Sequence, residues 1–275
     1  MPQARVSVIM GIYNCAATLP DAIDSLLNQT YTDWELIMCD DGSSDDTFAV
    51  AQSYAQKYPA RISVIRNPSN MGLNYTLNRC LERAEGEYIA RMDGDDLSLP
   101  QRFEKEVAFL DSHPEYAIVS TPMIYFDENG DWGQGTAIEI PQIRDFVNHA
   151  PFHCHAPCMI RKDAFLEVHG YTVDKKLLRF EDCNLWYKLY AAGYRGYNLQ
   201  IPLYKMRDDR NAYHRRKPSI RMRGVYVQWL GFHMVKMPKK YYPYLLVEFV
   251  KDLAVVMLPE KIYVFLHKRK QRAGL

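Results

Sequence analysis

The sequence has no long apolar run of the kind found in membrane-spanning proteins. No stretch approaches the roughly 18 consecutive uncharged apolar residues that a transmembrane helix needs. A charged leader followed by an apolar stretch and a small-residue cleavage site is also missing. We therefore expect neither a membrane-spanning helix nor a secretory signal.

The cysteines lack the spacing of a disulfide or metal framework. The six of them are scattered at positions 15, 39, 80, 154, 158 and 183. This usage indicates reduced thiols and a cytoplasmic location. His153, Cys154, His155 and Cys158 are close in the sequence, but no second CxxC-like pair completes a tetrahedral zinc set, so we do not expect a zinc centre.

Neither sign of charge is in excess. The 34 Lys and Arg residues nearly balance the 33 Asp and Glu residues, and the formal net charge is +1. This balance excludes a global electrostatic attraction to nucleic acid, and we expect no nucleic-acid partner. The charges are uneven, however, with acidic clusters early and basic clusters after Arg207.

Residues 6 to about 126 alternate short strand-like runs with amphipathic helical patterns. Helices are predicted to begin near Thr18 and Ser98, where proline and apolar residues at helical spacing follow. The alternation predicts an α/β fold with a doubly wound, mostly parallel sheet, which forms a Rossmann-like nucleotide-binding half. The predicted strands cover residues 6–10, 34–39, 62–65, 87–90 and 116–119.

Polar turns follow the first four predicted strands. The ligand crevice of a parallel sheet lies at the carboxyl ends of its strands, so these turns are expected to meet at one edge and to form a nucleotide-type pocket. They are Gly11-Ile12-Tyr13-Asn14, Asp40-Asp41-Gly42-Ser43-Ser44, Asn67-Pro68-Ser69-Asn70-Met71-Gly72 and Asp93-Gly94-Asp95-Asp96.

The fourth turn places three carboxylates within four residues. Their mutual repulsion is usually compensated by a divalent cation that prefers oxygen ligands, such as Mg²⁺ or Mn²⁺. Short Asp/Gly clusters also occur as solvated turns without any ligand. The local sequence leaves both interpretations open.

A second pair of carboxylates, Glu181 and Asp182, begins a predicted helix whose apolar stripe includes Leu185, Trp186 and Leu189. The dipole at a helix N-terminus stabilises ionised carboxylates. Capping of the helix alone would explain this pair, so the local sequence does not assign it a catalytic role.

The composition changes after residue 216. Residues 225–266 are rich in Tyr, Val, Leu, Phe and Met, and basic clusters interrupt them. We predict amphipathic helices over residues 217–275. Helices of this kind either lie in a membrane interface or pack on the domain or on a partner chain, which would give a homodimer.

Together these motifs resemble those of the family 2 glycosyltransferases of the GT-A fold, and in particular the EpsE-like enzymes of bacterial exopolysaccharide operons. The similarity runs from Val6 to about Lys217. It divides the chain into a GT-A domain at 1–216 and a C-terminal amphipathic helical region at 217–275. Within the domain, residues 1–126 would bind the nucleotide-sugar and residues 127–216 the acceptor. The motifs that carry the resemblance are residues 6–14, 34–47, 86–96 and Glu181-Asp182.

The resemblance implies an inverting transferase that uses a nucleotide-sugar, with a UDP-sugar as the expected donor. It implies that Tyr13 and Asp41 hold the base and ribose. Asp93 and Asp95 would provide the ribose and metal environment. Mn²⁺ or Mg²⁺ on the diphosphate would be held by Asp95 or Asp96.

The same resemblance implies that Asp182 is the general base and that Glu181 supports it. The chemistry agrees, because loss of a nucleoside diphosphate needs a cation at the leaving phosphate and a carboxylate that accepts the acceptor's hydroxyl proton.

Four further residues complete the expected donor site. Gly11 and Asn70 belong to the first and third polar turns. Gly11 departs from relatives that offer a hydroxyl side chain there, which affects the expected contacts to the base. His155 and Arg207 are candidates for positive charge near the diphosphate, although a packed histidine and a surface arginine are alternatives.

The expected acceptor is a growing glycan on a polyprenyl lipid carrier, which would place the enzyme peripherally on the inner face of the cell membrane. Two other functions stay open. A nucleotidyltransferase would share the sheet and the acidic site, but residues 11–14 lack the Gly-rich loop and phosphate-binding Lys or Arg that favour it. A catalytically silent nucleotide-sugar-binding module is the other alternative, because a fold alone does not fix function.

Overall fold

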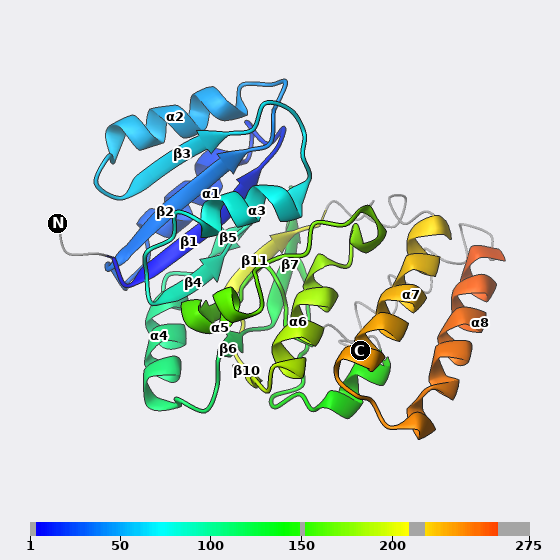
Figure 1. The fold of residues 1–275 in the computed structure, drawn as a ribbon. Helices are drawn as coiled ribbons and strands as arrows, with labels where there is room; N and C mark the ends of the chain where they lie inside the picture. Colours follow the sequence, from blue (N-terminus) through cyan, green and yellow to red (C-terminus); the bar gives the residue numbers. More distant parts are fainter. Residues whose placement is uncertain (1–3, 149–151, 209–217, 258–275) are drawn as a thin grey trace.

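The computed structural model describes residues 4–148, 152–208 and 218–257. Its main feature is a seven-stranded sheet in the order β10-β6-β9-β4-β1-β2-β3. Figure 1 shows this sheet surrounded by helices. The strands are β1 (Val6–Ile12), β2 (Trp34–Asp40), β3 (Ile62–Arg66), β4 (Tyr88–Arg91), β6 (Ile118–Ser120), β9 (Met159–Arg161) and β10 (Gly196–Asn198).

The sheet is mostly parallel, as the sequence predicts. Strands β1, β2, β3 and β4 pair in parallel, with Val6 opposite Trp34 and Tyr88. Strand β9 is the exception, since it pairs antiparallel with both β4 and β6. Strand β9 cannot be predicted from the sequence, because Met159–Arg161 is too short to show a strand period.

Alternate residues of β1 face two separate apolar cores. Ile9 packs in the core that includes helices α3, α5, α6 and α7. Val8 and Met10 pack in the other core, with helices α1, α2 and α4. Burial on both faces explains why the strand reads as a continuous apolar run. These helices are α1 (Leu19–Leu27), α2 (Thr47–Lys57), α3 (Leu73–Leu81), α4 (Arg102–Ser112), α5 (Lys162–Glu167), α6 (Glu181–Ala191) and α7 (Pro218–Met234).

A second, four-stranded sheet lies beside the main one, in the order β5-β11-β7-β8. Its strands are β5 (Leu97–Ser98), β7 (Met123–Asp127), β8 (Gly130–Gln134) and β11 (Tyr204–Arg207). The sequence predicts a helix start at Ser98. Instead, Ser98 belongs to β5 and pairs with Tyr204 of β11, and α4 begins at Arg102. This sheet brings β11 next to the acidic turn that follows β4.

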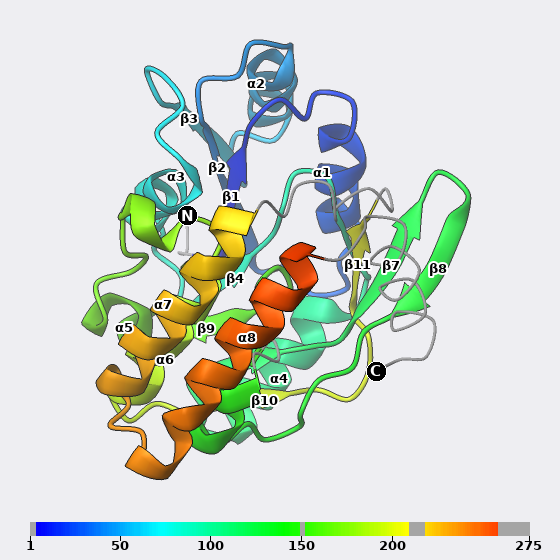
Figure 2. The same cartoon turned by 90° about the vertical axis from the view of Figure 1, so that its right-hand side faces the viewer.

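Most of residues 218–257 is helical, as the sequence predicts, and the rest of the predicted helical region, residues 217 and 258–275, lies outside the described residues. Helix α7 packs on α6, and α8 (Pro243–Met257) packs on α7 (Figures 1 and 2). Val227 and Phe232 of α7 are fully buried in the domain core. In the part of the chain that the structure describes, no helix is both long and apolar enough to span a bilayer.

Candidate active site

Two adjacent pockets open where the strands β1, β2 and β4 end. The Asp41 pocket has a volume of about 390 Å³, and its walls include Asp41, Asn70, Leu178 and Glu181. The Asp95 pocket has a volume of about 420 Å³, and its walls include Asp93, Asp95 and Arg207. Gly11 and Tyr13 line both pockets. The polar turns therefore meet at one edge of the sheet, as predicted.

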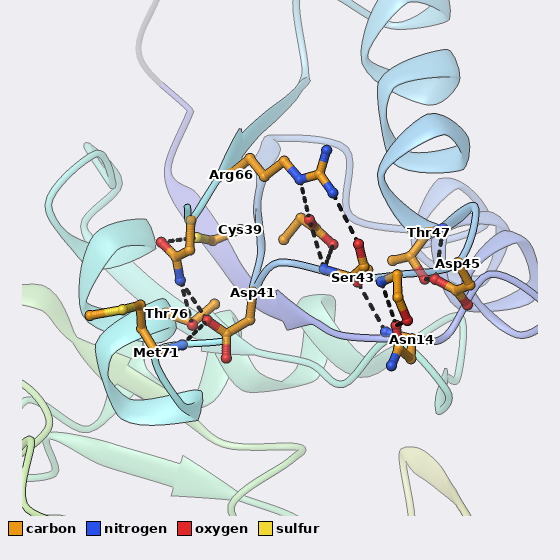
Figure 3. A network of polar contacts seen from close by, with 12 residues as sticks. Asn14, Cys39, Asp41, Ser43, Asp45, Thr47, Arg66, Met71 and Thr76 are labelled. Carbon is orange, nitrogen blue, oxygen red and sulfur yellow. Dashed lines mark hydrogen bonds and ion pairs between the residues drawn. The ribbon is translucent and has the colours of Figure 1, made fainter. Parts of the chain in front are cut away.

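Hydrogen bonds join the first polar turn, which follows β1, to the second, which follows β2 (Figure 3). The backbone N–H of Asn14 donates to Ser43 Oγ at 3.0 Å. Asn14 Oδ1 accepts the backbone N–H of Ser44 at 2.9 Å. Asn14 has a φ of 49°, in the left-handed region that asparagine tolerates better than most residues. Tyr13, immediately before it, is thereby held at the junction of the two pockets.

The carboxylate of Asp41 organises the third turn. It accepts backbone N–H groups from Met71 at 2.8 Å and Gly72 at 2.9 Å, and the Asn67 side-chain amide at 2.7 Å (Figure 3). Asp41 is buried, and Asn70 is exposed on the pocket wall. Asp41 thus fixes the pocket's shape, while its predicted contact with a base or ribose stays a prediction.

Gly11 lies where α3 packs closely on β1. A Cβ atom there would lie 3.0 Å from Leu73 Cδ1 and 3.3 Å from Thr76 Cγ2. A side chain here would need Leu73 or Thr76 to shift by a few tenths of an ångström, so the close packing favours a glycine at position 11.

The acidic turn after β4 is held by Arg91 of β4 and by two residues of the distant strand β11. Arg91 Nη2 donates to Asp93 Oδ1 at 2.5 Å. The backbone N–H of Asp93 donates to the Tyr204 hydroxyl at 3.2 Å. Arg207 Nε donates to the backbone carbonyl of Asp95 at 3.0 Å. Strand β11 thereby places Arg207 in the wall of the Asp95 pocket, where its guanidinium also lies over the Phe126 ring at 4.6 Å.

Asp95 and Asp96 differ in their surroundings. Asp95 is exposed and lines the pocket. Asp96 is 2% exposed, is not among the residues of either pocket wall, and accepts the backbone N–H of Arg207 at 2.7 Å. Burial and the neighbouring charges of Asp93 and Asp95 raise the pKa of Asp96 well above its usual value. The predicted metal contact is therefore favoured by the geometry for Asp95 and not for Asp96.

The carboxylates of Glu181 and Asp182 occupy the first turn of α6, as predicted. Glu181 lines the Asp41 pocket, whereas Asp182 is in neither pocket wall. Asp182 Oδ1 accepts the backbone N–H of Cys183 at 2.7 Å. Burial raises the pKa of both carboxyls, and the adjacent charge of Asp182 adds to the rise for Glu181. Raised pKa values are typical of acid–base residues, but the catalytic assignment stays a prediction.

His155 does not supply the expected positive charge. Its Nε2 is hydrogen-bonded to the Tyr171 hydroxyl at 2.8 Å. Burial, with a smaller contribution from the charge of Arg91, holds the pKa of His155 well below its ordinary value. The ring is therefore neutral at physiological pH, and His155 fits the alternative of a packed histidine better than that of a positive charge near the diphosphate.

Sequence reasoning overlooked two residues of this region. Arg91 directly follows the predicted strand 87–90, and a charged residue next to an apolar strand can indicate a buried partner. Tyr204 gave no signal, because its contact with the acidic turn depends on the second sheet. Both residues contact or approach Asp93 from elements other than its own turn.

A mostly parallel sheet with a two-part pocket and an acidic turn at its carboxyl edge is typical of nucleotide-binding α/β enzymes. Residues 7–169 match the model of the family described as Glycosyl transferase family 2. The chain belongs to this family, and it is a glycosyltransferase of the GT-A fold.

The sequence is similar to "Putative glycosyltransferase EpsE" of Bacillus subtilis, with 41% identity over 98% of this chain and 97% of that protein. Two solved structures share the fold at 18% identity. S. aureus TarS 1–349 in complex with UDP has a TM-score of 0.62, covering 98% of this chain and 88% of that one. The mannosyltransferase PcManGT of Pyrobaculum calidifontis, in complex with GDP-Man and Mn²⁺, has a TM-score of 0.64, covering 99% and 84%.

Proposed function

We propose that this chain transfers a hexose, with inversion, from a UDP-sugar to a glycan or lipid-linked acceptor during assembly of an exopolysaccharide, capsule or other cell-surface polysaccharide. The observation that carries the proposal is the pair of pockets joined at Gly11 and Tyr13. One pocket has the acidic turn in its wall, and the other has Glu181. This arrangement offers separate places for a nucleoside, a diphosphate and a base.

The residues around Asp95 fit a divalent cation shared with a diphosphate. Among residues 4–148, 152–208 and 218–257, no three His, Cys, Asp or Glu side chains form a group that could hold a metal ion. Mg²⁺ and similar ions are commonly bound by one or two carboxylates together with substrate phosphates. Asp95 would supply the protein oxygen, and a bound Mn²⁺ or Mg²⁺ would neutralise charge on the leaving phosphate.

The surroundings of the Asp95 carboxylate favour the binding of a cation. Partial removal from water and the charge of Asp93 raise the pKa of its carboxyl, and Arg91 and Arg207 oppose the rise. A cation at this position would relieve the repulsion between the two carboxylates. The Arg207 side chain, in the same pocket wall, would add a fixed positive charge for the diphosphate.

Asp182 is proposed as the base, with Glu181 beside it. A carboxylate at a helix N-terminus can be ionised at neutral pH although burial raises its pKa. It would accept the proton of the acceptor hydroxyl while the bond to the diphosphate breaks on the opposite side of the sugar. A displacement from the opposite side inverts the anomeric configuration.

The C-terminal region is proposed to bind the inner face of the cell membrane. Exposed apolar side chains of α8 include Leu246 at 66% and Val250 at 55%. Lys239 and Lys240 precede the helix and are exposed. An apolar face beside basic residues is the pattern of interfacial helices, and it would bring the active site to a lipid-linked acceptor.

A binding screen followed by an activity assay tests the proposed function. A ligand that binds only the folded protein raises the melting temperature, so UDP-, GDP- and dTDP-sugars are compared with and without Mn²⁺. We expect the largest stabilisation from a UDP-sugar with Mn²⁺, and release of UDP from that donor on incubation. A protein that binds no nucleotide-sugar, or that binds one and never cleaves it, would contradict the proposal.

A further inference from the structure

Arg91 is the last residue of β4, and its side chain is buried beneath the acidic turn. The residue is 5% exposed. Its backbone is fixed on both sides, because its N–H donates to the Cys158 carbonyl at 3.0 Å and its own carbonyl accepts Arg102 Nη2 at 2.9 Å. A guanidinium in such a place has a strongly defined position.

Only some of the N–H donors of this guanidinium have a hydrogen-bond partner within the described residues. Nη2 donates to Asp93 Oδ1 at 2.5 Å, which fixes one oxygen of a carboxylate in the Asp95 pocket wall. The buried Nε has no hydrogen-bond partner among the described residues. A buried charged donor without a partner is costly, so it indicates a role beyond stability.

The positive charge of Arg91 also acts on carboxyl groups outside the acidic turn. It lowers the pKa of both Glu181 and Asp182, in opposition to the rise that burial causes. It acts in the same direction on Asp95. Lys175 and Arg179 also carry positive charge in the wall of the Asp41 pocket, which includes Glu181. Three further groups face the pair but add no positive charge, since they are neutral when protonated and negative when not: Cys183 of α6, Cys154 before β9 and Tyr171 before α6.

We propose that Arg91 is a positioning residue of the donor site: its buried guanidinium orients Asp93 toward the donor and provides positive charge among the carboxylates of the crevice. This inference rests on the proposed function. It explains why a charged residue ends a strand whose other members are apolar. Desolvating a lone guanidinium is unfavourable, whereas one paired with the Asp93 carboxylate is electrostatically favourable.

The test compares Arg91→Gln and Arg91→Lys with the wild-type enzyme. The glutamine variant removes the charge, so we expect the acidic limb of the kcat/KM profile to move to higher pH by about one unit. We expect its affinity for UDP with Mn²⁺ to fall about tenfold or more, because Asp93 loses its partner. The lysine variant retains the charge without the planar fork. It should therefore restore the wild-type acidic limb while its donor KM stays raised.

The matched control is Arg161→Gln in the neighbouring strand β9. Arg161 is half-buried and donates to the Tyr116 carbonyl at 3.0 Å and the Leu110 carbonyl at 2.6 Å, away from the carboxylates. Its loss should lower the melting temperature without moving the pH profile.

The proposal is overturned if folded Arg91→Gln has the wild-type pH limb and donor affinity. If Arg91→Gln does not fold, the test rests on Arg91→Lys. A displaced acidic limb of kcat/KM or an unchanged donor KM in the lysine variant would then contradict the proposal. Absence of any transfer or hydrolysis by the wild-type enzyme would instead count against the proposed function.

Discussion

Asp96 Oδ1 accepts the backbone N–H of Arg207 at 2.7 Å, which joins the acidic turn of the main sheet to strand β11 of the second sheet. Strand β11 also provides Tyr204, whose hydroxyl accepts the N–H of Asp93. The turn is therefore held from outside its own sheet. As a result, the three aspartates of one short motif have three different surroundings.

Asp95→Asn is expected to abolish the metal dependence of donor binding. The variant keeps the shape of the side chain but removes the anionic oxygen that faces the Asp95 pocket. Because this exposed residue makes few internal contacts, the melting temperature should stay close to the wild-type value. Calorimetry with UDP and Mn²⁺ should show affinity reduced by more than about tenfold. A variant with undiminished Mn²⁺ dependence would remove Asp95 from the metal site.

Asp96 is expected to behave differently. In Asp96→Asn the amide oxygen can still accept the Arg207 N–H, so metal-dependent UDP binding should be largely retained. In Asp96→Ala that buried N–H loses its partner, and the free energy of unfolding should fall by about 1–3 kcal/mol. Denaturant unfolding measures this loss. Equal loss of Mn²⁺-dependent binding in Asp95→Asn and Asp96→Asn would show that both carboxylates bind the metal.

The alternation of strands and helices was predictable because its signal is local. Apolar runs such as residues 6–10 show burial on both faces, and a polar turn after each run marks the carboxyl edge. The different contacts of the three aspartates in the acidic turn were not predictable, because Tyr204 and Arg207 approach the turn from more than 100 residues away. The neutral state of His155 was hidden for the same reason, since it depends on burial beside Arg91 and Tyr171.

Membrane binding is expected to depend on the exposed face of α8. Deleting everything after residue 217 would be a poor test, because Val227 and Phe232 of α7 belong to the core. The double variant Leu246→Asp, Val250→Asp avoids this problem, since both side chains are exposed. Each buried aliphatic side chain contributes about 1.5–3 kcal/mol, so partitioning onto anionic vesicles should fall by at least about tenfold.

Vesicle flotation checks that prediction, and Leu166→Asp is its control. Leu166 is a comparably exposed residue on α5, and its substitution should leave flotation unchanged. If the wild-type chain does not float with anionic lipid but elutes as a dimer that the double variant disrupts, α8 is a contact between copies of the chain.

The roles of Glu181 and Asp182 can be separated by isosteric amides. Burial raises the pKa of both carboxyls above their ordinary values, so the base is protonated, and activity is lost, as the pH falls through the raised pKa. Asp182→Asn cannot accept a proton at any pH, and loss of a positioned base costs about 10²–10⁴-fold in rate. Binding of UDP and Mn²⁺ should survive, because the base acts on the acceptor.

Glu181→Gln should retain a larger share of the activity if Asp182 is the base. It also removes one negative charge beside Asp182, so the acidic limb of its rate profile should move to lower pH. Steady-state rates from pH 5 to 9, with UDP affinity measured in parallel, distinguish the two variants. The opposite ranking, with Glu181→Gln nearly inactive and Asp182→Asn active, would assign the base to Glu181. That result would agree with the position of Glu181 in the wall of the Asp41 pocket.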